Sequence, residues 1–374
     1  MKRNFMFWNV FRDCNFSCDF CEFKITLSGD IGCSKAFARF KDLDFHKAML
    51  RLYDEQLSRV GSWSICLTGG EPLLMPHLPF LSRELIRRGH RMLYNTNLSV
   101  PIEKNEDFLA SNPPEAVDVF MVSIHPESHR HLDKILERIR LLKGMGYRLI
   151  VRTVATLEAF STMRMLDDVC REMDVTFTPL GFRPFRDNTN LLEYTQEQFI
   201  FLRSFMKGYG ELISLYGGLD TREVTCHARY RSLVLSTTSE DMIIAVGTCI
   251  NCMAQRLAVF DLSLPTAGEG LYDHIAREPQ PCPCPTTACR CPSHFEYGLV
   301  VGLEEAEDQY EKMCKGVTEP VWEKFESWVL RTGLRLHSSP RCLKDVPTQL
   351  HSILPFKRRF GFLNKFLKPL SRNS

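Results

Sequence analysis

The sequence lacks long hydrophobic runs and any strong excess of one charge. No segment approaches the roughly 18 uninterrupted apolar residues that a membrane-spanning helix needs. The apolar stretch near the N-terminus is broken by Asn9 and ends at Arg12, so it is too short for a signal peptide. The formal net charge is only +2, which predicts no broad basic face and no nucleic-acid partner.

Cysteine is abundant, with 15 residues in a chain of 374. Because they cluster tightly and no signal peptide precedes them, we interpret them as metal ligands in a reducing cytoplasm rather than as disulfides. Hydrophobic residues make up 44% of the chain and charged residues 25%, as in an ordinary globular protein. The length predicts one large domain and a smaller one.

Three cysteines stand at close, unequal spacing after a short apolar run: Cys14, Cys18 and Cys21. Thiolates are soft ligands that suit iron–sulfur clusters and zinc. A structural zinc site needs a fourth protein ligand, which this loop does not offer. Three thiolates instead satisfy three corners of a four-iron cluster and leave one iron open to a ligand. The spacing therefore predicts a [4Fe-4S] cluster with an open iron.

A second pattern, Thr68-Gly69-Gly70-Glu71-Pro72, follows a short apolar segment. The CxxxCxxC loop, with Phe20 before its last cysteine, and this Gly-Gly-Glu stretch together resemble the radical S-adenosylmethionine (radical SAM) superfamily. The resemblance covers about residues 5 to 180. It implies that S-adenosylmethionine binds the open iron and is reductively cleaved to a 5′-deoxyadenosyl radical.

The resemblance also implies which residues contact the cofactor. The candidates share a position at or near the ends of predicted strands, and they are Gly69, Gly70, Glu71, Asn97, Ser123 and Arg152. Glu71 is expected to accept hydrogen bonds from the ammonium group of the cofactor. No catalytic residue stands out, and His125 is only a candidate to face substrate or cofactor. Asn97, Ser123 and Arg152 are also open to a plain interpretation as loop caps. The Gly-Gly-Glu stretch could form merely a turn, and a histidine before proline at a turn is ordinary.

Strand and helix patterns alternate about six times over the first half of the chain. Strands are expected at 5–11, 63–68, 91–95, 118–124, 147–155 and 174–180. Helices are expected from Asp44 to about Val60 and near 78–89, 129–145 and 158–173, and a helix at 195–216 is expected to lead away from the sheet. This alternation predicts an α/β fold with a parallel sheet, and the resemblance implies a partial (β/α)6 TIM-like barrel. Functional residues then gather at the C-terminal ends of the strands.

The region after residue 220 is rich in cysteine. Two alternating segments, 231–237 and 242–246, predict a β-hairpin. The cysteines around and beyond it are Cys226, Cys249, Cys252, Cys282, Cys284, Cys289 and Cys291. They resemble the SPASM and twitch extensions of radical SAM enzymes, although the spacing of the last four departs from the usual SPASM pattern. We expect one auxiliary [4Fe-4S] cluster here, with two clusters or a structural zinc site as alternatives.

The predicted organisation has four parts. They are a radical SAM partial barrel (1–220), a cysteine-rich auxiliary cluster domain that contains the hairpin (221–300), a helical segment (301–350) and a basic amphipathic tail (351–374). The tail carries six basic residues and no acidic one. It is interpreted as a helix docked on its own protein, or as a weak contact with a membrane surface or an acidic partner.

The resulting functional hypothesis is a radical SAM enzyme that abstracts hydrogen from an organic substrate. Cys14 comes almost at once, which leaves no room for a preceding peptide-recognition domain, so a small molecule such as a sugar or alcohol is favoured over a ribosomal peptide or protein. Flavodoxin or ferredoxin is the expected reductant. The alternative from another class is a non-catalytic metal-binding adaptor or electron carrier, for which neither the Gly-Gly-Glu stretch nor the alternating elements are needed.

Overall fold

The structure is a computed structural model. It describes residues 4–11, 13–18, 20–21, 37–181, 194–220, 231–237, 243–247, 256–264, 269–275 and 304–336. All of them belong to one compact unit, Met1–Ser339. The cysteines at 226, 249, 252, 282, 284, 289 and 291 and the tail at 351–374 lie outside the described residues, as do Cys33, Arg183 and Cys342.

A nine-stranded sheet forms the framework, with the strand order β6-β5-β4-β3-β2-β1-β7-β8-β9. Seven neighbouring strands run parallel: β1 (Asn4–Asn9), β2 (Trp63–Thr68), β3 (Arg91–Thr96), β4 (Val117–Ser123), β5 (Leu149–Val154), β6 (Thr176–Leu180) and β7 (Ser232–Thr237). The antiparallel strands β8 (Ile243–Gly247) and β9 (Arg256–Asp261) extend the sheet beyond β7. Since β1 to β6 lie in chain order, each connection crosses to the adjacent strand.

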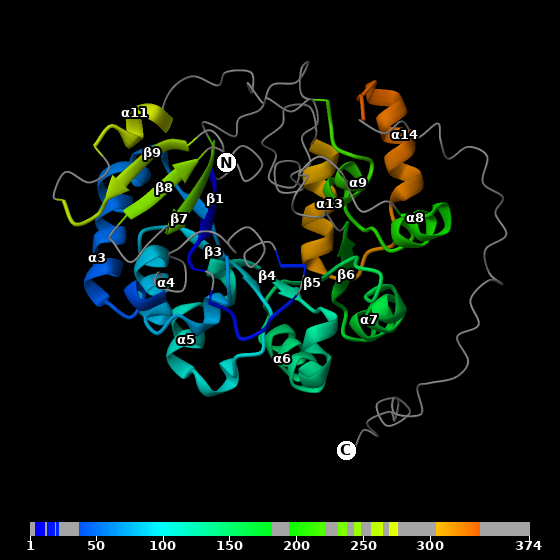
Figure 1. The fold of residues 1–374 in the computed structure, drawn as a ribbon, viewed down its shortest axis with the longest axis horizontal. Coiled ribbons are helices and arrows are strands. Elements are labelled where there is room, and N and C mark those ends of the chain that lie inside the picture. The colour runs from blue at the N-terminus through cyan, green and yellow to red at the C-terminus, as the bar shows by residue number, and fades with distance from the viewer. Residues whose placement is uncertain are drawn as a thin grey trace. The chain divides into compact units, whose positions relative to one another are not determined.

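Helices follow the strands and cover one face of the sheet. They are α3 (Leu43–Leu52), α4 (Leu78–Arg87), α5 (Glu106–Ser111), α6 (Leu132–Gly144) and α7 (Phe160–Glu172). Figure 1 shows these five helices in an arc along the outside of the strands. In α4 the apolar side chains Leu78, Leu81 and Leu85 are buried, as expected for the inward face of an amphipathic helix.

The opposite face of the sheet is covered by α13 (Glu304–Lys315). Apolar side chains from six strands and this helix form one core cluster: Phe5, Phe7, Cys66, Leu93, Val119, Met121, Ile150, Val234, Tyr310, Met313 and Cys314. Both faces of the parallel strands are therefore buried, which explains why the strands are apolar throughout rather than alternating. Along β1, β2, β3, β4, β5 and β7, the residues on the α13 side become polar towards the C-terminal ends.

The six strands predicted between residues 5 and 180 are confirmed to within two residues at each end, as neighbours in a parallel sheet. The predicted hairpin is also present as β7 and β8, but β7 in addition pairs in parallel with β1. The helix expected from Asp44 begins at Leu43, because Asp42 is the residue that caps it, accepting a hydrogen bond from the backbone N–H of Asp44 at 2.9 Å.

The single helix expected at 195–216 is wrong in two respects. It consists of two helices, α8 (Gln196–Arg203) and α9 (Tyr209–Leu215), separated by a turn that ends at Gly208. It also does not lead away from the sheet, because α9 contacts β6 and α13. A final helix, α14 (Trp322–Thr332), packs on α9 through ring contacts of Tyr209 with Phe325 and Trp328.

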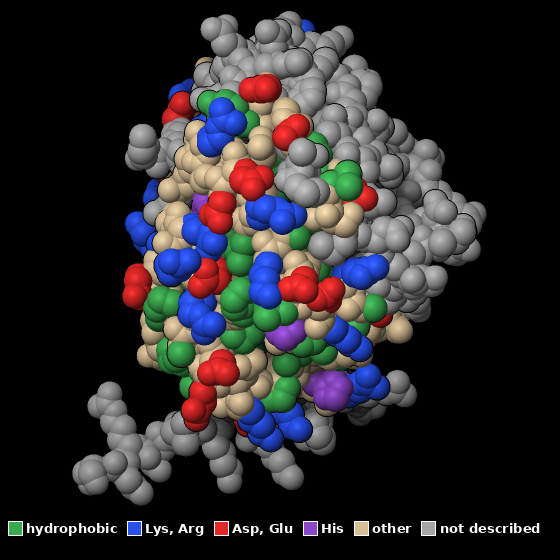
Figure 2. All heavy atoms as spheres, turned by 90° about the vertical axis from the view of Figure 1, so that its left-hand side faces the viewer, with side chains coloured by type: hydrophobic (Ala, Val, Ile, Leu, Met, Phe, Trp, Pro, Cys, Tyr) green, Lys and Arg blue, Asp and Glu red, His purple; other side chains and the backbone are tan. Residues whose placement is uncertain are grey.

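Charged side chains are mixed on the described part of the surface that carries α3. Figure 2 shows basic and acidic groups interspersed there, with small apolar patches between them. This part of the surface therefore presents no extended field of one sign. Among the described helices, none has the length and apolarity needed to cross a membrane.

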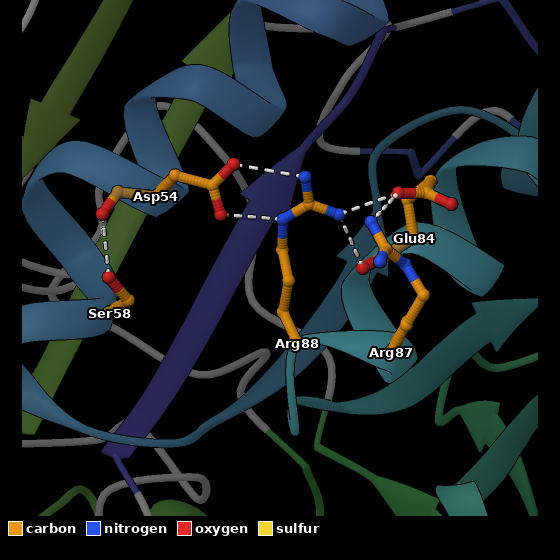
Figure 3. A network of polar contacts seen from close by, with 5 residues as sticks. All are labelled: Asp54, Ser58, Glu84, Arg87 and Arg88. Carbon is orange, nitrogen blue, oxygen red and sulfur yellow. Dashed lines mark hydrogen bonds and ion pairs between the residues drawn. The ribbon is translucent and has the colours of Figure 1, made fainter.

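One polar network on this side joins two outer helices. Arg88 lies between the π-helix Tyr53–Leu57 and α4 (Figure 3). Its guanidinium binds both carboxylate oxygens of Asp54, at 2.6 and 2.9 Å, and Glu84 at 2.8 Å. A bidentate arginine–carboxylate pair has better geometry than most surface ion pairs.

We expect Arg88→Ala to lower the free energy of unfolding by about 1 kcal/mol, because Asp54 is half-exposed and its pairing is screened by solvent. Arg87→Ala is the matched control: Arg87 is more exposed and makes a single contact with Glu84 at 2.9 Å. It should change the free energy by no more than about 0.5 kcal/mol. Urea unfolding measures both values, and equal effects would show that the Asp54 contact contributes nothing.

Candidate active site

The cysteine loop begins where β1 ends. The backbone N–H of Val10 donates to the carbonyl of Thr68 at 3.0 Å, which continues the pairing of β1 with β2 up to the loop. Beyond it, Cys18 is buried, Cys21 is half-buried and Cys14 is exposed. All three are free thiols.

The three sulfur atoms affect one another electrostatically. Burial, followed by the neighbouring charges of Glu127, Cys21 and Cys14, raises the pKa of Cys18 to about 12. The pKa of Cys14 is also raised, first by desolvation and then by Glu71 and Cys21. A positively charged group among the three sulfurs would reverse both effects, since it stabilises thiolates. The arrangement therefore fits a group of iron ions.

Among the described residues, no three His, Cys, Asp or Glu side chains converge tightly enough to hold a single metal ion.

The Gly-Gly-Glu loop is bound directly to the backbone of the cysteine loop. The N–H of Gly70 donates to the carbonyl of Phe11 at 2.6 Å, and the N–H of Glu71 donates to the carbonyl of Asp13 at 2.9 Å. Gly69 has φ of +119°, and a Cβ atom there would stand 2.4 Å from the Phe11 carbonyl oxygen. Only glycine allows this approach. The two sequence motifs thus form one continuous structure.

The carboxylate of Glu71 is buried and receives three hydrogen bonds from the chain itself. Oε1 accepts from the backbone N–H of Leu73 at 3.0 Å and from the hydroxyl of Thr96 at 2.6 Å, and Oε2 accepts from the N–H of Asn97 at 2.7 Å. These bonds favour the charged form, but burial is the larger influence and raises the pKa of Glu71 to about 7. Glu71 therefore holds the loop that follows β3.

A row of polar side chains crosses the sheet at its C-terminal edge, on the face that α13 covers further back. Its members are Asn9, Thr68, Asn95, Ser123, Arg152 and Ser236. The sheet register pairs Asn9 with Thr68 and with Ser236, and it pairs Ser123 with Arg152. Side-chain hydrogen bonds join Asn95 to its neighbours in the row. Asn95 donates to Thr68 at 3.0 Å and accepts from Ser123 at 3.3 Å. Asn9 donates to Ser236 at 3.3 Å. The part of this row before Arg152 is uncharged.

Arg152 ends this row and is paired with α9. Its Nη2 lies 3.1 Å from Oε1 of Glu211, and both side chains are buried. Nη1 lies 3.2 Å from the sulfur of Met121. The sequence predicted only that Arg152 and Ser123 stand near strand ends, and β4 and β5 pair these two residues directly. It did not predict Glu211, because a lone acidic residue in a helix pattern carries no signal of a buried partner.

His125 stands against the cysteine loop. Its ring meets that of Phe20 edge to face, with centroids 4.8 Å apart, and burial lowers its pKa to about 4. The imidazole is therefore neutral at physiological pH. A second ring contact follows, because His131 stacks on Phe16 with centroids 5.8 Å apart. The segment after β4 thus lines one side of the cysteine loop.

Of the sequence-predicted residues, the structure brings together Cys14, Cys18, Cys21, Gly69, Gly70, Glu71, Asn97 and His125 around one loop, with Ser123 and Arg152 in the adjoining row. Sequence reasoning missed Asn15 and Ser99, which contact Asn97. The only available signal was proximity in sequence to Cys14 and Asn97. The seven C-terminal cysteines cannot be placed, since they lie outside the described residues.

Comparison with known proteins assigns part of the chain. Residues 8–159, which include both motifs, match the model of the Radical SAM superfamily. This match supports a radical SAM domain, for which the family implies a [4Fe-4S] cluster and S-adenosylmethionine. No curated protein sequence matches the chain.

Several solved structures are similar. SuiB from Streptococcus suis has a TM-score of 0.48 and 13% identity, covering 74% of this chain and 66% of that chain. anSMEcpe with bound AdoMet has a TM-score of 0.47 and 13% identity, covering 87% of this chain and 99% of that chain. TYW1 with a lysine-pyruvate adduct bound has a TM-score of 0.31 and 17% identity, covering 53% and 69%. At these scores the likenesses carry no weight for the function.

Proposed function

We propose that the protein is a radical SAM enzyme that abstracts a hydrogen atom from an organic substrate. One observation carries the proposal: the cysteine loop and the Gly-Gly-Glu loop form a single hydrogen-bonded structure at the C-terminal edge of a parallel sheet. An adaptor or electron carrier that merely holds iron has no need of this second loop. The family match over residues 8–159 supports the same conclusion.

In this proposal Cys14, Cys18 and Cys21 hold three irons of a [4Fe-4S] cluster. When bound, the reduced cluster and S-adenosylmethionine together supply a 5′-deoxyadenosyl radical, which removes hydrogen from the substrate. The chain's own residues orient the reactants and exclude water. His125 and Phe20 shield one side of the loop. The buried carboxylate of Glu71 keeps the loop after β3 in position.

The cofactor is proposed to bind beside this loop. Gly69 and Gly70 permit close approach of the backbone, and Ser123 and Arg152 stand next to each other on the sheet face. The guanidinium of Arg152 suits the carboxylate of the cofactor. On binding it, Arg152 would give up its ion pair with Glu211. Asn97 adjoins Cys14 and completes the set.

The substrate is proposed to meet the uncharged hydroxyl and amide groups of the row from Ser236 to Ser123. Such groups suit hydroxyls and amides of a ligand. A small molecule such as a sugar or alcohol presents them, and so does a peptide. Flavodoxin or ferredoxin is the proposed electron donor.

A cysteine-rich auxiliary site is part of the proposal, on the sequence alone. The cysteines are Cys226, Cys249, Cys252, Cys282, Cys284, Cys289 and Cys291, and one [4Fe-4S] cluster is proposed for them. Two clusters or a zinc site are the alternatives. Colour and metal content distinguish an iron–sulfur cluster from a zinc site, because a zinc site is colourless and has no redox signal.

The test is anaerobic incubation of reconstituted protein with a reductant, S-adenosylmethionine and perdeuterated sugars, alcohols or peptides. Transfer of deuterium from one of these substrates into 5′-deoxyadenosine is the expected result, and it identifies the substrate class at the same time. An iron-loaded protein that forms no 5′-deoxyadenosine with any reductant would contradict the proposal and favour an electron carrier.

A further inference from the structure

Three polar side chains beside Cys14 form a closed ring of hydrogen bonds. Asn97 Nδ2 donates to Asn15 Oδ1 at 3.0 Å, Asn15 Nδ2 donates to Ser99 Oγ, and Ser99 Oγ donates to Asn97 Oδ1 at 2.6 Å. We call Asn15, Asn97 and Ser99 the amide ring. Asn15 belongs to the cysteine motif, whereas the other two follow β3. The ring therefore joins two segments that are far apart in sequence.

The ring fixes which end of the Asn97 amide faces the cysteine. Its Oδ1 accepts two hydrogen bonds from Ser99, one from the hydroxyl and one from the backbone N–H at 2.9 Å. An amide nitrogen in that place would face the backbone N–H of Ser99, which can only donate, so the opposite orientation is unfavourable. Consequently Nδ2 is the end that reaches Asn15, and it also donates to the Cys14 sulfur at 3.6 Å.

The loop that carries Asn97 is held from two sides. Glu71 accepts the backbone N–H of Asn97, and Arg138 donates to the carbonyls of Leu98 and Ser99 at 3.2 and 2.7 Å. Leu98 adopts φ of +53°, a conformation that costs energy for a side chain other than glycine. Asn97 itself is only 8% exposed. The amide is thus pre-positioned rather than free to turn away.

Among the described residues, two N–H groups donate to the Cys14 sulfur: the Asn97 amide at 3.6 Å and the backbone N–H of Phe16 at 3.4 Å. The carboxylate of Glu127 lies near Cys18 and disfavours negative charge there. The reduction potential of an iron–sulfur cluster depends on hydrogen bonds to its sulfurs and on nearby charge. The two donors therefore favour added electron density at Cys14.

We propose that Asn97 is a positioning residue that raises the reduction potential of the cluster through its hydrogen bond to Cys14. An N–H donor stabilises negative charge on sulfur, and the reduced cluster places more of that charge there than the oxidised cluster. The inference rests on the proposed function, because it needs a cluster on Cys14. It gives Asn97 a role that does not require contact with S-adenosylmethionine.

The experiment measures the midpoint potential of the cluster in full-length protein without S-adenosylmethionine, by EPR-monitored titration. Cys226, Cys249, Cys252, Cys282, Cys284, Cys289 and Cys291 are left intact, and a signal absent from the Cys14/Cys18/Cys21→Ala protein identifies the loop cluster. In Asn97→Ala, we expect reduction to become about tenfold less favourable, a shift of about 59 mV to lower potential for one electron. Asn97→Asp, which replaces the donor by an oxygen, should shift at least as far.

Asn95→Ala is the matched control. Asn95 is the same residue type two positions earlier, within β3, but its amide donates to Thr68 and not to sulfur. Its variant should keep the wild-type potential. If both Asn97 variants keep the wild-type potential, or if Asn95→Ala shifts equally, the inference is wrong. A wild-type protein without any loop cluster would contradict the proposed function instead.

A second measurement decides the matter if the Asn97 variants fail to take up iron. Wild-type protein is labelled with 15N in the asparagine side-chain amides, reduced and studied by pulsed EPR. Coupling of the loop cluster to an asparagine amide nitrogen is expected, because Asn15 directs its own Nδ2 to Ser99 and leaves Asn97 as the donor. Absence of this coupling would overturn the inference.

Discussion

Changing Cys14, Cys18 and Cys21 together to Ala is expected to abolish reductive cleavage of S-adenosylmethionine. The physical reason is that these thiolates supply the protein ligands of the loop cluster, and a structure without them leaves no iron for the cofactor to bind. The measurement is anaerobic formation of 5′-deoxyadenosine, together with iron and sulfide content. Cleavage at the wild-type rate in the triple variant would refute the assignment of the loop.

Cys170→Ala provides the control for this loss. Cys170 is a buried free thiol of α7, remote in sequence from both motifs. Its replacement should leave iron content and cleavage unchanged. Iron that remains in the triple variant reports on the C-terminal cysteines. About four irons with a reducible paramagnetic signal would support an auxiliary cluster. A colourless protein with about one zinc per chain would instead indicate a structural zinc site in that region.

The sheet could be predicted closely because its strands are short, apolar on both faces and separated by amphipathic helices. Strand β2, for example, is buried at all six positions and bounded by glycine on each side. Such a pattern has few alternative interpretations. The parallel pairing of β7 with β1 was not predictable, since the hairpin pattern at 231–246 specifies only the antiparallel partner.

Helix α9 shows why the sequence misled at 195–216. Its seven residues are all buried, including Glu211, so the segment has no polar face that would indicate its orientation. The ion pair with Arg152 compensates the buried charge of Glu211, and that partner lies 59 residues earlier in the chain. Long-range pairing of this kind leaves no periodic trace in the sequence.

The candidate site was predictable where a short motif fixes its own chemistry. The three cysteines and the Gly-Gly-Glu stretch are of this kind. The direct bonding between them was not, because it depends on the backbone carbonyls of Phe11 and Asp13, and any residue type provides a carbonyl. The role expected for the Glu71 side chain changes for the same reason: three donors of the chain bind its carboxylate, and two of them, Thr96 and Asn97, stand at the end of β3.

Glu71→Ala is expected to destabilise the protein, and more strongly in acid. The variant leaves the donors of Leu73, Thr96 and Asn97 buried without their acceptor, each at a cost of roughly 1–3 kcal/mol. The pKa of Glu71 in the folded protein is about 7, above its ordinary value of 4.5 because of burial. The folded state therefore binds the proton more tightly than the unfolded state.

The direction of the pH dependence follows from this difference. The stabilisation by proton binding is fully present below pH 4.5 and is lost as the pH rises to about 7. The decrease in the free energy of unfolding caused by Glu71→Ala should accordingly be about 2 kcal/mol larger at pH 5 than at pH 8. Urea unfolding of both proteins at the two pH values gives this difference, and subtraction removes the contribution of other titrating groups. A loss independent of pH would mean that Glu71 is ionised throughout.

Glu71→Ala is also expected to weaken the binding of S-adenosylmethionine while leaving the iron content unchanged. With the carboxylate gone, the segment of Thr96 and Asn97 is no longer held against the Gly-Gly-Glu loop. Loss of a charge-assisted hydrogen bond of roughly 1.5–3 kcal/mol corresponds to about 10- to 150-fold in affinity. Titration of the reconstituted protein with the cofactor measures this loss.

Glu71→Gln distinguishes the size of the Glu71 side chain from its hydrogen bonding. The variant keeps the side-chain volume but replaces one acceptor oxygen by an NH2 group, which in the position of Oε2 would meet the N–H of Asn97 instead of accepting it at 2.7 Å. An affinity that falls in Glu71→Ala and stays normal in Glu71→Gln would show that side-chain volume, and not the accepted hydrogen bond, positions the loop.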